Sequence, residues 1–208
     1  MIAVLVGFIP AVQTFLASKI TDRFNQQFST NISILRANLT FSGTIALNNV
    51  LVNDHKKDTL FFINQLEISA LGLIDLISSN PNIRTMKLAG LNVNLKTYKN
   101  DSISNLNYFI QQFQKSPSDS IASFSMKAGS IELVGGSVFF SNDNNNQREP
   151  FFLDNITFLV DDFNLNENNF EARFKDFSLT TSEGIDITSF TSNISFFKSE
   201  IVTVPLTG

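Results

Sequence analysis

The sequence predicts a mainly β protein. An N-terminal membrane helix should precede an elongated antiparallel sheet that curls into an open trough and carries one or two short helices. Three observations support this: the first 18 residues carry no charge, strand–glycine–strand segments recur along the chain, and 22 of 208 residues are Phe while only 16% are charged. Soluble domains average about 25% charged residues, so this chain has a large apolar surface that needs a partner.

The uncharged segment over residues 1–18 predicts a membrane anchor. As a helix it covers about 27 Å, close to the roughly 30 Å core of a bilayer. The alternative is a cleaved signal peptide, but cleavage after Ala17 would place Phe15 at the −3 position, where a small residue is needed. We therefore expect an uncleaved single-pass anchor over residues 1–28, followed by the trough over residues 29–208. No Lys or Arg precedes the apolar run, and we expect an N-terminal portion of a longer chain.

Four segments share one pattern, in which a short alternating strand, a glycine and a second alternating strand follow one another. Their glycines lie 47, 46 and 48 residues apart, at Gly43, Gly90, Gly136 and Gly184. Such regular spacing is typical of repeated architectures. Apolar positions change parity across the glycines, as between Leu88 and Leu91, and a strand does this only through a bulge or a turn. We expect a glycine-marked bulge and about three strands in each repeat.

Other segments complete the repeats. The runs LFFINQLEIS (60–69) and FFLDNITFLV (151–160) follow polar turns and predict strands, while residues 71–77 and 104–115 predict short helices. Strands with one apolar side indicate a sheet that is wet on one face and dry on the other. The dry faces of two sheets could meet in a sandwich, or a single sheet could curl into a trough. Alternation alone does not separate these forms, and repetition favours the trough.

The segment LNVNLK (91–96) shows the two faces of the predicted sheet most clearly, because its apolar and polar residues alternate. A dry face that lines an open trough would suit acyl chains. The residues that we expect along such a lipid path are Leu47, Leu88, Leu91, Val93, Leu95, Val138 and Phe140.

Composition and motifs argue against several other functions. The net charge of −4 and the absence of basic runs argue against nucleic-acid binding, and a chain without Cys has no thiolate metal site. His55, the only histidine, lies in a charged turn, so we expect a solvated side chain and no catalytic site. A calcium-loop spacing that begins at Asp162 fails at Glu167 and Arg173. We expect no enzyme activity, no metal and no cofactor.

The N-terminal half resembles TamB-like proteins of the AsmA-like superfamily, found in Gram-negative bacteria. The resemblance is carried by VQTFLASKITDRFN (12–25), by SGTIALNNVLVNDHKKDTLFFINQLEIS (42–69) and by the strand pair NIRTMKLAGLNVNL (82–95). Within the second segment, Asp54, Asp58, Thr59 and Leu60 match the turn-to-strand signature of the family. Beyond about Lys99 the resemblance rests on the repeat alone.

The resemblance implies an inner-membrane anchor and a periplasmic β-trough that reaches toward the outer membrane. It further implies passage of phospholipid between the two membranes, with an outer-membrane barrel assembly protein as partner. The alternative function is that of a scaffold or chaperone in a translocation and assembly module, which would support insertion or secretion of outer-membrane proteins by offering strand edges. The family's C-terminal domain is not recognisable in this sequence.

Overall fold

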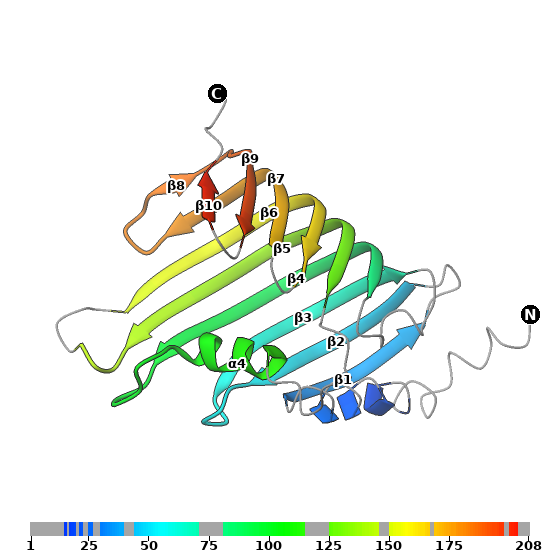
Figure 1. Cartoon of the computed structure of the whole chain (residues 1–208), viewed down its shortest axis with the longest axis horizontal. Helices are drawn as coiled ribbons and strands as arrows, with labels where there is room; N and C mark the ends of the chain where they lie inside the picture. The colour runs from blue at the N-terminus through cyan, green and yellow to red at the C-terminus, as the bar shows by residue number, and fades with distance from the viewer. Residues whose placement is uncertain are drawn as a thin grey trace, which may run out of the picture.

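The computed structural model of the chain is mainly β (Figure 1). It describes residues 15, 17–19, 21–22, 25–26, 30–39, 44–70, 81–114, 125–145, 150–166, 169–197 and 200–203. Its elements, in chain order, are β1 (Asn31–Leu39), β2 (Thr44–Asn53), β3 (Thr59–Ala70), β4 (Asn82–Thr97), α4 (Asn105–Gln114), β5 (Met126–Asn142), β6 (Phe151–Leu165), β7 (Asn169–Thr181), β8 (Asp186–Ile187), β9 (Ser192–Phe197) and β10 (Glu200–Thr203).

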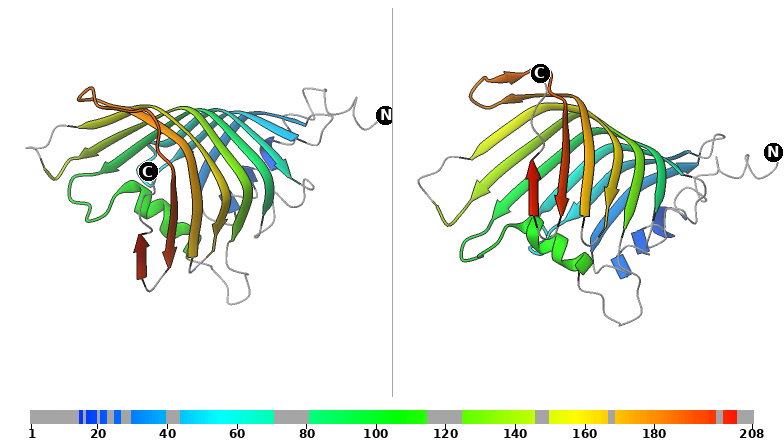
Figure 2. Two further views of the ribbon diagram at one scale, coloured as in Figure 1. Left: turned by 90° about the horizontal axis from the view of Figure 1, so that it is seen from above. Right: turned by 45° about the horizontal axis from the view of Figure 1, so that its top comes forward.

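All ten strands in the described part of the chain belong to one open sheet. Nine of them lie side by side in the order β1-β2-β3-β4-β5-β6-β7-β9-β10, and β8 pairs with β7 beside this path. The sheet does not close, and within the described ranges no second sheet faces it. Figure 2 shows that the long strands bend, so that the sheet arches around one of its faces. The open-sheet form predicted from the sequence is confirmed, and the sandwich alternative does not hold here.

The prediction of an entirely antiparallel sheet is wrong at one place. β4 and β5 pair in parallel, with Val93 opposite Val138, whereas the other neighbouring strands are antiparallel. Parallel neighbours need a crossover connection of a dozen or more residues, because a short hairpin reverses the chain. The segment between Thr97 and Met126 provides this connection and contains α4. α4 agrees with the helix predicted over residues 104–115, whereas the helix predicted over 71–77 lies outside the described residues.

A line of residues with left-handed backbone conformation crosses the middle of the sheet. It runs from Asn49 in β2 (φ 51°) to Gly90 in β4 (φ 63°), Gly135 in β5 (φ 67°) and Asn155 in β6 (φ 51°). Pairs on either side of Gly90 and Gly135 keep one register, so these two glycines lie side by side in β4 and β5. Bulges and left-handed residues bend a strand and change which side chains face inward. We attribute the arch of the sheet to this line.

The four spaced glycines do not occupy equivalent positions. Gly90 lies within a single 16-residue strand, β4, where the sequence predicted two strands. Gly136 follows the left-handed Gly135 in β5, and Gly184 lies in the turn between β7 and β8, where its N–H donates to the carbonyl of Thr181 at 3.0 Å. Gly43 lies outside the described residues. The pairing of β5 with β6 shifts register at Gly136, as a bulge requires. Pairs on either side of Gly90 keep one register with both β3 and β5, so the bulge prediction is wrong at Gly90, as it is at Gly184.

We expect Gly90→Ala to lower the free energy of unfolding by about 2–3 kcal/mol and Gly135→Ala by about 1–2 kcal/mol. An alanine at either position would be strained by the positive φ of the backbone there. Only at position 90 would the new Cβ also lie 3.1 Å from Cβ of Asn64, because nothing lies within 4 Å of a Cβ at position 135. Urea denaturation of the two variants measures the difference. Equal effects would contradict the assigned contact between Gly90 and Asn64.

Two groups of buried residues pack on the face that lies inside the arch. The first joins Ala17 to Ala37 in β1 and to Ile45, Leu47 and Val50 in β2. The second lies over β4 to β7 and is built from Ile83, Ala128, Ile131, Val160 and Ala172. Helical residues near Ala17 thus pack against the sheet. Within the described residues no helix has the length and apolar character to cross a membrane, and the anchor over residues 1–28 stays a prediction.

Candidate functional site

The face inside the arch, called the inner face below, is the candidate functional site. Residues directly opposite each other in neighbouring strands point to the same face of a sheet. One such row crosses five strands, and each of its members is apolar: Val52, Phe61, Val93, Val138 and Leu153. A second row lies on the other side of the line of left-handed residues and is also apolar: Leu47, Leu66, Leu88, Leu133 and Phe158.

The register places all seven predicted lipid-path residues on the inner face. Leu47 and Leu88 belong to the second row, and Val93 and Val138 to the first. Leu91 pairs with Ile63, and Ile63 packs against the first buried group together with Leu66. The inner face therefore continues across the line of left-handed residues. The pair Leu95–Phe140 extends the face toward the ends of β4 and β5. Alternation in the sequence thus identified the residues of one face.

Burial varies along this face. Leu47 is buried beneath the helical residues near Ala17. Val93 and Val138 are partly exposed, and Phe140 is exposed. α4 lies on the same side of the sheet (Figure 2), where Phe109 contacts Phe61 edge to face with ring centroids 5.6 Å apart. The inner face is therefore covered at β1–β3 and more open toward β5 and β6.

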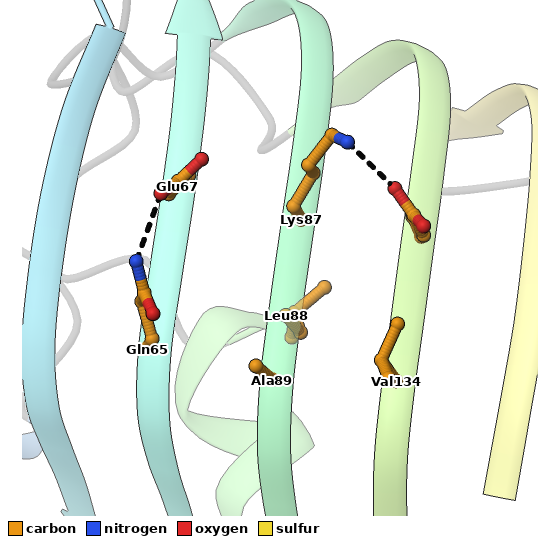
Figure 3. A pocket seen from close by; sticks show the side chains of 7 residues that line it. Gln65, Glu67, Lys87, Leu88, Ala89 and Val134 are labelled. Carbon is orange, nitrogen blue, oxygen red and sulfur yellow. Dashed lines mark hydrogen bonds and ion pairs between the residues drawn. The ribbon is translucent and has the colours of Figure 1, made fainter.

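The outer face carries charged side chains at the middle of β3, β4 and β5. Figure 3 shows a shallow hollow on this face, lined by residues of β3, β4 and β5. Glu67, Lys87 and Glu132 lie in one row across these strands, and the Lys87 ammonium lies 2.9 Å from the Glu132 carboxylate. Across β3, β4 and β5 this row places charged side chains on the outer face, opposite the apolar rows of the inner face.

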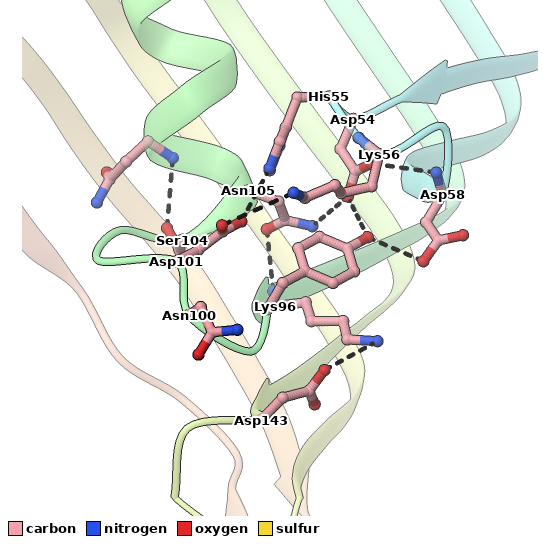
Figure 4. A network of polar contacts seen from close by, with 12 residues as sticks. Asp54, His55, Lys56, Asp58, Lys96, Asn100, Asp101, Ser104, Asn105 and Asp143 are labelled. Carbon is pink, nitrogen blue, oxygen red and sulfur yellow. Dashed lines mark hydrogen bonds and ion pairs between the residues drawn. The ribbon is translucent and has the colours of Figure 1, made fainter.

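A polar network joins the β2–β3 turn to the connection between β4 and α4 (Figure 4). Asp54, only 5% exposed, accepts hydrogen bonds from the backbone N–H groups of Lys56 and Asp58 at 2.8 and 3.0 Å. It also accepts from the Tyr98 hydroxyl at 2.7 Å and from the Asn105 side chain at 3.1 Å. This turn carries the family-like signature, and Leu60, which follows it, is fully buried.

These contacts shift the pKa values of two groups in opposite directions. Burial alone would raise the pKa of Asp54, but the hydrogen bonds from Tyr98, Asn105 and the turn N–H groups outweigh it and hold this pKa below its ordinary value. Burial and the hydrogen bonds to Asp54 and Asp58 raise the pKa of Tyr98. At neutral pH the network therefore consists of an ionised Asp54 and a neutral Tyr98.

Asn105, the first residue of α4, takes the place of a strand beside β4. Its Oδ1 accepts from the Lys96 backbone N–H at 2.9 Å, and its Nδ2 donates to the Asn94 carbonyl at 2.9 Å. These are the groups that a neighbouring strand would bond. The side chain is 1% exposed, so α4 is fixed to the edge of β4 at this point. Sequence reasoning missed this role because it depends on a contact between residues of different elements.

His55 has more contacts than a solvated turn residue. It lies in the exposed β2–β3 turn, as predicted, but its Nε2 lies 3.1 Å from Oδ2 of Asp101. Its ring also packs on Tyr108 of α4, with centroids 4.0 Å apart. Asp162, the first residue of the failed calcium loop, forms an ion pair with Arg173 at 3.0 Å. The described residues contain no grouping of His, Asp and Glu side chains suited to a metal ion.

No protein-family model matches the sequence, and no curated protein sequence matches it. The resemblance to TamB-like proteins therefore rests on the residues quoted for it above.

Proposed function

We propose that this protein is an inner-membrane-anchored periplasmic conduit through which phospholipid passes between the inner and outer membranes. One observation carries the proposal: the inner face presents uninterrupted rows of apolar side chains across β2 to β6, and no second sheet covers these rows in the described part of the chain. An apolar floor of this kind suits acyl chains, while head groups remain in water at the open side.

The energy of lipid transfer supports such a floor. Moving an acyl chain of about 16 methylenes into water costs about 13 kcal/mol at roughly 0.8 kcal/mol per methylene. A continuous apolar surface removes most of this cost. Neighbouring strands lie about 4.8 Å apart, so the nine consecutive strands provide a path of about 40 Å. A path across a wider space needs further strands from a longer chain.

Location and partners are proposed from the family resemblance. The proposal places the anchor of residues 1–28 in the inner membrane of a Gram-negative bacterium and the sheet in the periplasm. An outer-membrane barrel assembly protein would receive the far end of the path. The proposal requires neither catalysis nor a cofactor.

A scaffold for outer-membrane proteins is the second candidate, and the edges of the sheet favour it. Within the described ranges β10 pairs with β9 alone and β1 with β2 alone, so each has an edge that an incoming strand could use. At β1, however, the Asn25 side chain already bonds both the N–H and the carbonyl of Ile32, each at 2.8 Å. This contact blocks part of one edge, and we therefore favour the conduit.

A photo-crosslinking residue tests the conduit in cells. We expect a crosslinker at Val93 to capture phospholipid, because this position lies on the inner face and is partly exposed. A crosslinker at Asn92, exposed on the outer face of the same strand, is the matched control and should capture none. Mass spectrometry of the adducts identifies the lipid. Capture of unfolded outer-membrane protein instead of lipid would favour the scaffold, and equal lipid capture at both positions would contradict the assigned path.

A further inference from the structure

Large apolar side chains are exposed together at one end of the sheet, where β5 meets β6 and β7 meets β8 (left in Figure 1). Five of them are between 36% and 57% exposed: Phe140, Phe151, Phe152, Ile185 and Ile187. The β7–β8 turn lies beside the start of β6, because the backbone N–H of Ser182 donates to the carbonyl of Phe152 at 2.9 Å. The other large exposed apolar residues of the described chain lie in different elements: Phe15 and Ile110 are helical, Leu35 is in β1 and Val134 in β5. We call these five residues the apolar end.

The apolar end presents aromatic rings on both faces of the sheet. Phe140 and Phe151 are paired on the inner face, with ring centroids 6.0 Å apart. Phe139 and Phe152 are paired on the outer face, with centroids 6.4 Å apart. A flat protein surface covers one face of a hairpin, whereas a lipid bilayer surrounds an inserted hairpin and covers both faces.

Charges around the apolar end narrow the choice of partner. Asp143, Glu183 and Asp186 lie in or beside the two turns, and Lys96 forms an ion pair with Asp143 at 3.4 Å. This balance is acidic, so it gives no attraction to an anionic surface. The exposed side chains on both faces fit an apolar medium that reaches both, with binding driven by removal of apolar area from water.

We infer that the apolar end inserts into the interfacial region of a lipid bilayer, at the level of the outer acyl carbons. Phe140 and Phe151 also lie on the inner face, so such an insertion would place the proposed lipid path in contact with a membrane. The inference itself rests on exposure, pairing and charge at these turns. The inference can be tested separately from the proposed conduit, because Phe152 and Ile185 are not residues of the proposed lipid path.

Tryptophan fluorescence gives a local test, since the chain contains no Trp. In the full chain, Phe152→Trp and Ile185→Trp each introduce a single reporter at the apolar end. Phe62→Trp is the matched control, because Phe62 lies on the outer face of β3 between Leu51 and Asn92. Each protein is mixed with phosphatidylcholine vesicles whose acyl chains carry bromine, which quenches tryptophan on contact. Any binding through the N-terminal segment is common to all three variants and does not affect the comparison.

We expect a blue shift and at least half of the emission quenched for Phe152→Trp and Ile185→Trp, with neither change for Phe62→Trp. Quenching should persist in about 1 M salt, where charges are screened beyond about 3 Å. An absence of quenching at the apolar end would overturn the inference, and so would equal quenching at position 62. Loss of quenching in salt would also overturn it, because binding would then depend on charge. Lipid capture at Val93 without quenching at position 152 would support the proposed conduit and overturn the inferred insertion into a membrane.

Discussion

Asp54→Ala should lower the free energy of unfolding by about 2–4 kcal/mol, because hydrogen bonds to a buried carboxylate are worth about 1.5–3 kcal/mol and its partners would be left short of acceptors. The change removes the acceptor for two turn N–H groups and for the Asn105 side chain. Without it, the β2–β3 turn loses its hydrogen bond to the first residue of α4 and keeps its His55 contacts with Asp101 and Tyr108. Denaturant unfolding measures the loss, which should exceed that of the other single changes in this network.

Asp58→Ala is the matched control for Asp54→Ala. Asp58 lies in the same turn and accepts from the same Tyr98 hydroxyl at 2.9 Å, but it is exposed. We expect its loss to cost less than about 1 kcal/mol, as for other exposed contacts. A cost at position 58 equal to that at position 54 would contradict the assignment of Asp54 as the centre of the network.

The lowered pKa of Asp54 also predicts a dependence of stability on pH. A carboxyl group with a lower pKa in the folded state than in the unfolded state binds its proton more weakly when folded. Its contribution is complete above the ordinary carboxyl pKa of 3.8 and is lost as pH falls through the lowered folded value. Asp54→Asn should therefore lose less stability than the natural protein when both are acidified from pH 6 to about pH 3.

Local patterns predicted much of the fold. Alternation along residues 91–96 placed Leu91, Val93 and Leu95 on one face, and the register of β4 confirms this. The change of parity between Leu88 and Leu91 predicted a bulge or a turn of the backbone; Gly90 has a positive φ there, but its strand keeps one register with both neighbours, so it is no bulge. Both features follow from the period of a strand and from the freedom of glycine, which can be recognised within ten residues.

Pairings between distant residues were not predictable in the same way. The parallel alignment of β4 and β5 depends on how a long connection returns the chain, and alternation is the same for parallel and antiparallel strands. Gly184 was misassigned because glycine favours turns as readily as bulges. The polar network needs Tyr98 and Asn105 to meet Asp54 more than 40 residues away, and no local signal marks that contact.

The central claim is that the inner face at Val93 is an open path and not a sealed core, and Val93→Asp separates the two. Val93 is partly exposed, so in an open path the carboxylate stays hydrated and the protein folds. An acyl chain passing that position would have to displace its water. A cost of about 2 kcal/mol lowers occupancy roughly 30-fold.

The measurement is the rate at which the protein transfers a labelled phospholipid from donor to acceptor vesicles, with the unfolding transition recorded on the same samples. Asn92→Asp is the control, since it places the same charge one residue away on the outer face and keeps the oxygen that accepts from the Ser137 hydroxyl at 2.6 Å. We predict that Val93→Asp folds with a normal transition and loses more than nine-tenths of the transfer rate, while Asn92→Asp retains it. An unfolded Val93→Asp protein, or a folded one that transfers lipid at the natural rate, would contradict the open path.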